Sequence, residues 1–385
     1  MIKPNCLFLV LACATWGAPS LLSAPAASVP PNAAALTAFL ATLPNWSVSA
    51  AAETSFGYKD NLLLSNDGEE KSGLARGGVE LLLLRVPKGR SDFSFFLQAD
   101  GTHYFSGKTV DDEAKAWVRT EPGYRLGETW KFSLPITGYH YDQVFDVSDT
   151  EVERLVAELK VNGIMVGPTV RWSFHPGWWV EAQAVGERKK YEDGVNDGRV
   201  REAAVRLGWK VGERFEARLG GFERRRDFDV RSQYTSAGRE LSGTELEIRD
   251  REAEAGFDVH WDRDGRWKTM TRAGVLRYRD NGSGYFNYRE RKVSHEFEWS
   301  SAQWHIRAGG IARRIEFEVQ TVGFGIEPPA RVKEEFTAEL RIERMLSPRW
   351  TAVAGYTWER SRSNDTIASY RVNEGLLGLR WSWDK

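Results

Sequence analysis

Apolar and polar residues alternate with a period of two along most of the chain, from Trp46 to Trp383. The clearest segments are 203–210, 215–221, 253–261 and 335–343. In each of them one set of alternate positions is apolar, and the other set is rich in charged residues. Because successive side chains of a strand point to opposite faces, this pattern predicts β-strands with one apolar and one charged face.

The connections between these strands are of two kinds, which alternate along the chain. Short turns stand at 87–90, 127–128, 175–177, 212–213, 262–265, 300–302 and 347–348. Longer polar connections stand at 61–72, 192–197, 231–242, 280–284 and 361–369. The alternation predicts antiparallel hairpins with roughly 16 strands, whose short turns all lie at one end of the sheet.

Aromatic residues flank almost every short turn. The tryptophans of this girdle are Trp130, Trp178, Trp209, Trp261, Trp267, Trp299, Trp304 and Trp350. Indole is amphipathic and settles at the membrane–water interface, so a row of Trp at one end of the strands predicts that they cross a membrane.

A sheet edge in lipid would leave unpaired amide groups, so the predicted sheet must close on itself. We therefore expect an all-β fold, a closed antiparallel transmembrane β-barrel of roughly 16 strands with short periplasmic turns and longer extracellular loops. The alternative is a soluble secreted β protein, in which the charged faces would be solvated.

The first 26 residues have the features of a secretory signal peptide. Lys3 supplies a positive start, residues 7–16 are apolar, and Ala24-Pro25-Ala26 fits a cleavage site. Export and an even number of strands favour the bacterial outer membrane.

The rest of the chain divides into two parts. Residues 27–45 are rich in Ala and Pro and predict a linker or a short periplasmic helix, and residues 46–385 would form the barrel. Both cysteines, Cys6 and Cys13, lie in the predicted signal peptide, so the mature chain would contain no thiol.

The segment 150–160 has two interpretations. Its apolar residues from Val152 to Leu159 have helical spacing, and Thr150 with Glu153 would form a capping box. The extended interpretation rests on alternate apolar residues at Leu155, Ala157, Leu159 and Val161. We favour a strand that projects beyond the membrane and runs on to Phe174. A helix here would be the best candidate for an element folded into the barrel.

The C-terminus carries a separate signal. Trp381 and Trp383 lie on one face with Leu377 and Leu379, and Gly378 stands three residues before Trp381. The arrangement resembles the terminal signal that bacterial outer-membrane proteins present to their insertion machinery. The resemblance implies that Gly378, Trp381 and Trp383 serve insertion and that this machinery is a partner.

The closing hairpin comprises residues 356–364, 370–373 and 378–383. It resembles the closing hairpin of porin-type barrels and is similar to the barrel portion of surface lipoprotein assembly modifiers. The resemblance implies the fold and the membrane. Those modifiers also carry a helical-repeat periplasmic domain that has no counterpart in this sequence, so their export role is not implied.

The overall charge is balanced, with 53 Lys and Arg against 54 Asp and Glu. Nucleic-acid binding would require a basic excess, so we expect no nucleic-acid partner. The charged faces predict lumen-lining residues at Arg206, Arg218, Glu254, Asp258, Arg272, Glu296, Arg307, Glu339 and Arg341. A buried unpaired charge costs several kcal/mol, so these residues should line water or pair across the lumen.

A barrel of roughly 16 strands encloses an aqueous channel rather than a core filled by side chains. We therefore expect a passive porin-like channel for small polar solutes, in which the charged lumen filters them. The alternatives are a lumen closed by salt bridges, in a non-conducting barrel that serves surface structure, adhesion or envelope assembly, and an outer-membrane barrel enzyme.

The sequence offers no catalytic motif. Its six histidines fit no recognised hydrolase or metal spacing, so we expect no catalytic residue, no metal and no cofactor. A barrel hydrolase stays open as an alternative, because its Ser–His or Asp–His site would form between strands and leave no trace in the periodicity.

Basic residues gather near the longer loops. They are Arg224–Arg226, Arg277, Arg279, Arg289, Arg291, Lys292, Arg313, Arg314, Arg360 and Arg362. If they face outward, they would bind lipopolysaccharide phosphates, which makes outer-membrane lipid and lipopolysaccharide expected partners. Solvated strand ends are the simpler explanation, and self-association into a homo-oligomer stays open.

Overall fold

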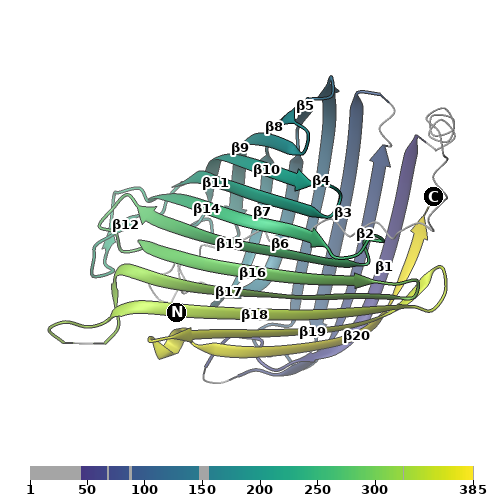
Figure 1. Ribbon diagram of the computed structural model, residues 1–385. Helices are drawn as coiled ribbons and strands as arrows, with labels where there is room; N and C mark the ends of the chain where they lie inside the picture. Colours follow the sequence, from purple (N-terminus) through teal and green to yellow (C-terminus); the bar gives the residue numbers. More distant parts are fainter. Residues whose placement is uncertain (1–44, 67–68, 86–88, 147–155, 324, 385) are drawn as a thin grey trace, which may run out of the picture.

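The computed structural model describes residues 45–66, 69–85, 89–146, 156–323 and 325–384. They form one large antiparallel sheet that closes on itself (Figure 1). Closure follows from the pairing of β1 (Trp46–Lys59), which lies between β2 and the last strand, β20 (Tyr370–Asp384). No helix in these residues is long and apolar enough to cross a membrane.

Fourteen barrel strands are continuous. Besides β1 and β20, they are β2 (Ser72–Arg85), β3 (Ser91–Tyr104), β4 (Asp112–Leu126), β9 (Trp178–Tyr191), β10 (Gly198–Val211), β11 (Phe215–Phe228), β14 (Glu247–His260), β15 (Trp267–Asp280), β16 (Tyr288–Ser300), β17 (Trp304–Thr321), β18 (Ala330–Met345) and β19 (Trp350–Ser363). A small hairpin of β12 (Gln233–Tyr234) and β13 (Glu240–Leu241) lies in a long loop, and the short helix η1 (Thr366–Ala368) precedes β20.

Two further barrel strands are interrupted. β5 (Trp130–Ser133) and β6 (Ile136–Asp146) both pair with β4, and β7 (Val156–Val166) and β8 (Thr169–His175) both pair with β9. Proline lacks the backbone N–H that a ladder needs, and Pro135 and Pro168 stand at the two interruptions. With each interrupted strand counted once, the barrel has 16 strands, so the predicted fold class is confirmed.

The prediction of a strand for 150–160 is confirmed over the described part, 156–160, which belongs to β7, but this part does not project freely, because Leu159 is buried inside the barrel. β7 and β8 together carry the strand past Phe174, with one interruption at Gly167 and Pro168. Residues 150–155 lie outside the described residues, as do the predicted signal peptide and all but the end of the 27–45 segment.

Ion pairs that reach over a strand identify the inner face of the barrel. Arg380 of β20 contacts Glu80 of β2 at 2.5 Å across β1, and Lys292 of β16 contacts Glu252 of β14 at 2.6 Å across β15. Contacts that reach farther, such as Arg341 of β18 with Glu53 of β1 over two strands at 2.5 Å, are possible only on the concave side, where side chains converge. Because directly opposed residues share a face, the register then assigns an inner and an outer face to every strand.

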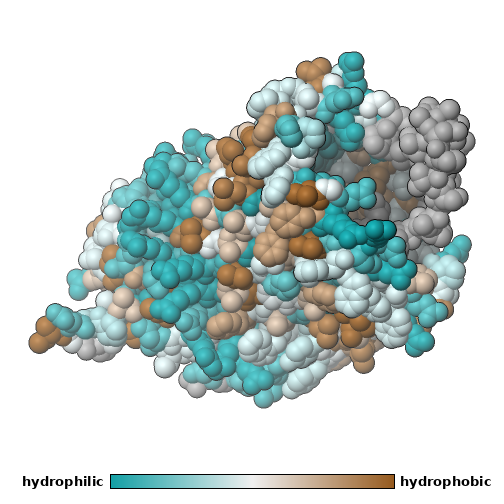
Figure 2. Space-filling model, viewed as in Figure 1, coloured by the Kyte–Doolittle hydropathy of each residue, from teal (hydrophilic) through white to brown (hydrophobic). Residues whose placement is uncertain are grey.

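The outer face carries an apolar belt. On β14 the outward residues from Trp261 to Ala253 are apolar, and on β19 the same holds from Trp350 to Trp358. At about 3.4 Å per residue and a tilt of about 40°, this length spans about 20–25 Å, the height of a lipid-facing band. Figure 2 shows part of the belt as pale and brown surface beside a hydrophilic region over the long-loop ends of β11 to β15.

Candidate functional site

The lumen of the barrel is the candidate functional site. The register places all nine predicted lumen residues on the inner face: Arg206 on β10, Arg218 on β11, Glu254 and Asp258 on β14, Arg272 on β15, Glu296 on β16, Arg307 on β17, and Glu339 and Arg341 on β18. They form no single cluster, because they belong to strands that occupy about half of the wall.

One ladder of ion pairs runs along β8 to β14. Glu181 lies between two arginines, 2.7 Å from Arg171 and 3.0 Å from Arg206. Arg218 contacts Asp258 of the next strand at 2.6 Å. The Arg206 side chain keeps 43 % of its surface exposed, so this part of the wall lines open space inside the barrel.

A second ladder covers the closing strands. Arg341 of β18 reaches over two strands to Glu53 of β1 at 2.5 Å and also contacts Glu343 at 2.6 Å. Its side chain is 37 % exposed. Glu339 is the next inward residue of β18 on the long-loop side of Arg341. It has no hydrogen bond or ion pair among the described residues, so no direct partner neutralises its carboxylate.

The lumen is filled at the long-loop end. There Arg331 and Lys333 of β18 are fully buried, as is Asp250 of β14, which Arg226 contacts at 2.6 Å. A buried cluster brings residues of the long loops against inward residues of β11 to β17: Phe228, Leu246, Ile248, Leu276, Tyr278, Tyr285, Phe286, Tyr288, Ile315 and Phe317. The interior therefore changes from open and charged to packed as it approaches the long loops.

The ends of β6 and β7 extend across this filled region. Val144 of β6 packs against a buried cluster on the first three strands and their loops, which contains Leu74 and Tyr104. Its backbone N–H donates to Glu113 of β4 at 3.1 Å. Leu159 of β7 is buried in a cluster with Val161, Tyr191 and partly buried Tyr139, Tyr141 and Phe145. The apolar face of this segment thus lies inside the barrel and not against lipid.

Asp146, the last residue of β6, crosses the lumen. Its carboxylate accepts a hydrogen bond from Lys333 Nζ of β18 at 2.8 Å. β6 and β18 stand on nearly opposite sides of the wall. Lys333 also contacts Glu335 at 2.6 Å, and Glu335 pairs with Arg313. We call this set of four residues the cross-lumen contact. The periodicity gave no indication of it, because nothing in one strand's pattern specifies a partner on the far wall.

The eight girdle tryptophans lie at the short-turn end, where seven occupy outward strand positions and Trp261 stands in a turn. Neighbouring rings contact one another, with centroids 5.5 Å apart for Trp178 and Trp209 and 5.7 Å apart for Trp267 and Trp299. Two other tryptophans, Trp117 and Trp179, face the lumen, and the Arg171 guanidinium lies 4.1 Å from the Trp179 ring.

At the C-terminus, Trp381 and Trp383 face outward opposite Ala52 and Ala50 of β1. Gly378 faces inward, where a Cβ atom would lie 2.4 Å from the Thr54 carbonyl oxygen. The glycine is therefore needed for close approach of the two closing strands. A role of these residues in insertion stays a prediction.

The histidines are scattered. His103, His140 and His295 face outward and contact Asp112, Asn162 and Thr271, and His175 is the last residue of β8, next to a short turn. His260 and His305 face the lumen near the short-turn end, where His305 lies 3.5 Å from Glu298.

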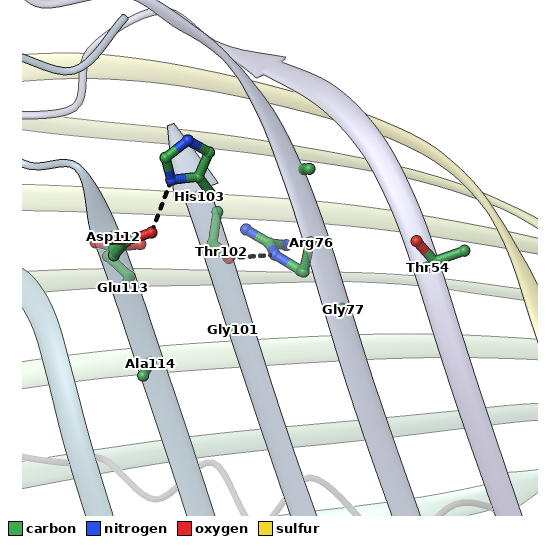
Figure 3. Close-up of a pocket in the computed structure, with 10 residues that line it drawn as sticks. Thr54, Arg76, Gly77, Gly101, Thr102, His103, Asp112, Glu113 and Ala114 are labelled. Carbon is green, nitrogen blue, oxygen red and sulfur yellow. Dashed lines mark hydrogen bonds and ion pairs between the residues drawn. The ribbon is translucent and has the colours of Figure 1, made fainter. Parts of the chain in front are cut away.

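A shallow hollow lies on the outer wall of β1 to β4, where the outward residues are small (Figure 3). Gly77, Gly101 and Ala114 lie along its floor, and the ion pair of His103 with Asp112 borders it at 2.8 Å. It belongs to the outer surface, separate from the lumen.

No protein-family model and no curated protein matches this sequence. Among solved structures the chain is similar to OccAB4 of Acinetobacter baumannii, with a TM-score of 0.48, 8% identity, and coverage of 89% of this chain and 99% of that one. It is also similar to OpdO of Pseudomonas aeruginosa, with a TM-score of 0.45, 13% identity, and coverage of 88% and 97%.

A third similar structure is a loop-deletion mutant of OmpT, an outer membrane protein of Vibrio cholerae, with a TM-score of 0.46, 11% identity, and coverage of 88% and 100%. The fold assignment rests on the closed sheet itself. The chain is a 16-stranded antiparallel β-barrel with an apolar outer belt, which is the architecture of bacterial outer-membrane proteins.

Proposed function

We propose that this protein is a passive, porin-like pore of the outer membrane for small polar solutes. The observation that carries the proposal is the hydrated, charged part of the lumen. Arg206 and Arg341 lie on inner faces of strands far apart in the wall and remain substantially exposed. A packed core would bury them, so water occupies this part of the barrel.

The filled long-loop end would set the resistance of the pore. The cross-lumen contact and the buried aromatic cluster would narrow the mouth at the long loops, while the ion-pair ladders would line a wider vestibule toward the short turns. Solutes entering the vestibule would meet alternating charges, which favours small polar or zwitterionic molecules over apolar ones.

The second candidate is a non-conducting barrel that serves surface structure or envelope assembly. The full burial of Arg331 and Lys333 favours it, because water does not reach them. The resemblance of the closing hairpin to that of the assembly modifiers stays a prediction.

Single-channel recording of the refolded protein in a planar bilayer distinguishes the two candidates. We expect discrete, stable conductance steps, smaller than those of a 16-stranded barrel with an unobstructed lumen. A heat-modifiable, inserted barrel that passes no current, and no sugar in a liposome-swelling assay, would overturn the pore proposal in favour of the second candidate.

Charge selectivity should depend on Glu339. Glu339→Lys is expected to lower the ratio of K⁺ to Cl⁻ permeability by about two- to fivefold, because a unit charge at about 4 Å is worth about 1 kcal/mol in water. The measurement is the reversal potential in a KCl gradient. Glu334→Lys is the matched control, since Glu334 lies on the outer face of the same strand and the same charge change there should leave the ratio unaltered. An equal shift in both variants would contradict a role for Glu339 in the lumen.

A further inference from the structure

On the long-loop side of the apolar belt, the outer face is rich in arginine from β9 to β20. We call these outward residues the arginine collar: Arg188, Arg199, Arg201, Arg225, Arg249, Arg251, Arg277, Arg279, Arg289, Arg291, Arg314, Arg360, Arg362 and Arg371. The described acidic residues on the same face are fewer: Glu223, Asp227, Asp229, Glu247, Glu316, Glu318 and Glu334. The collar therefore has a large positive excess.

Within the collar arginine stands directly opposite arginine on neighbouring strands. The opposed pairs are Arg188 with Arg199, Arg201 with Arg225, Arg225 with Arg249, Arg249 with Arg279, Arg251 with Arg277, Arg277 with Arg289, Arg291 with Arg314, and Arg360 with Arg371. Like charges directly opposite each other destabilise a sheet. A face with alternating positive and negative side chains would be equally soluble and would avoid this repulsion. The opposed arginines therefore indicate that an external anion binds between them.

The acidic residues of this face do not neutralise the centre of the collar. Glu223 pairs with both Arg249 and Arg251, and Glu318 pairs with both Arg279 and Arg289. Among the described residues Arg277 and Arg291 have no hydrogen bond or ion pair, and both are exposed. Each guanidinium presents five N–H donors, whose fork geometry matches phosphate oxygens.

The position of the collar specifies where the anion must lie. Arg277 is the next outward residue after Val275 on β15, and Arg291 stands next to Val293 on β16 in the same way. The guanidinium groups therefore lie at the edge of the apolar belt, at the depth of lipid headgroups and on the long-loop side, which faces outward in such barrels. Figure 2 shows this side of β11 to β15 as a largely hydrophilic surface.

The collar is confined to one side of the barrel. On β1 to β4 the outward residues nearest this level are Tyr58, Ala75, His103 and Asp112. No arginine occupies an outward position at this level among the described residues of those strands. A general requirement of membrane insertion would place arginine all round the rim, so its restriction to β9–β20 indicates a specific contact.

From the depth, the charge and the opposed arginines we propose that the arginine collar binds the phosphate groups of lipopolysaccharide in the outer leaflet. The centre of the site comprises Arg277 and Arg291, with Arg251, Arg289 and Arg314 on the flanking positions. Bound phosphates bridge the opposed arginines and remove their repulsion. This inference is independent of whether the lumen conducts.

The test compares binding of purified lipopolysaccharide by the refolded, detergent-solubilised protein and two variants. R277Q/R291Q removes the two unpartnered guanidinium groups, and R214Q/R263Q removes the same charge from exposed short turns at the opposite rim. We expect about tenfold or greater loss of affinity for R277Q/R291Q and no change for R214Q/R263Q. Dephosphorylated lipopolysaccharide should bind the wild type as weakly as the intact lipid binds R277Q/R291Q.

A stability measurement separates ligand binding from a structural role. Without lipopolysaccharide, R277Q/R291Q should unfold at the same temperature as the wild type or above it, because opposed like charges have been removed. Adding lipopolysaccharide should stabilise the wild type more than this variant. Equal lipid binding by wild type and R277Q/R291Q, destabilisation of R277Q/R291Q in detergent alone, or full competition by sodium pyrophosphate at equal phosphate concentration would overturn the proposal.

Discussion

Asp146→Asn is expected to raise the single-channel conductance several-fold. The substitution removes the charge that Lys333 contacts across the lumen at 2.8 Å, and with it an ion pair that ties the end of β6 to the far wall. Breaking one partner of a buried pair costs about 3–5 kcal/mol, which is enough to release the ends of β6 and β7 from the lumen. The measurement is the step size in planar bilayers at fixed salt.

Two further variants test this explanation. Lys333→Met should give the same increase, and the double variant should add little to either, because all three variants break the contact between Asp146 and Lys333. Asp142→Asn is the matched control, since Asp142 pairs with Lys160 of the neighbouring strand, 3.4 Å away, and does not reach across the lumen. An unchanged step size in Asp146→Asn with a folded barrel would show that the contact does not limit the pore.

Gly57→Val is expected to prevent closure of the barrel. A Cβ atom at Gly57 would lie 2.0 Å from the carbonyl oxygen of Gly375, so the clash is with backbone and cannot be relieved by a rotamer change. β1 and β20 would have to separate, at a cost of about 3 kcal/mol or more. Refolding followed by unheated gel electrophoresis should show most of the fast-migrating, folded species lost.

The same pair of strands supplies the control. At Gly375 a Cβ atom would meet no heavy atom within 4 Å, so Gly375→Val should refold like the wild type. Equal folding of the two variants would mean that β1 and β20 can shift apart at no cost, against a tightly paired closing seam.

The wall of the barrel could be predicted from the sequence because lipid imposes one rule on every strand. Each strand needs an apolar outer face of fixed length and an aromatic residue near the short turn. Both features recur along the amino-acid sequence. The interruptions at Pro135 and Pro168 did not disturb the strand count, since the alternation continues on both sides of each proline.

The interior could not be predicted in the same way. Leu159 and Val161 alternate with polar residues as lipid-facing side chains do, yet they face inward. Alternation of apolar and polar residues reveals that one face of a strand is apolar. It does not reveal whether that face points to the lipid or to the lumen. The contact between Asp146 and Lys333 joins residues 187 positions apart, and only the closed three-dimensional structure brings them together.

The two interruptions of the wall lie side by side, since the N–H of Gly167 donates to the carbonyl oxygen of Pro135 at 2.9 Å. The proline carbonyls still accept hydrogen bonds, but neither proline can donate one in return. Between the two prolines and the short turns, β5 and β8 form a short ribbon of four register pairs, with Trp130 stacked on Trp172. Because two donors are missing from the ladder here, we expect this corner of the rim to flex with the bilayer surface more readily than the continuous strands on either side.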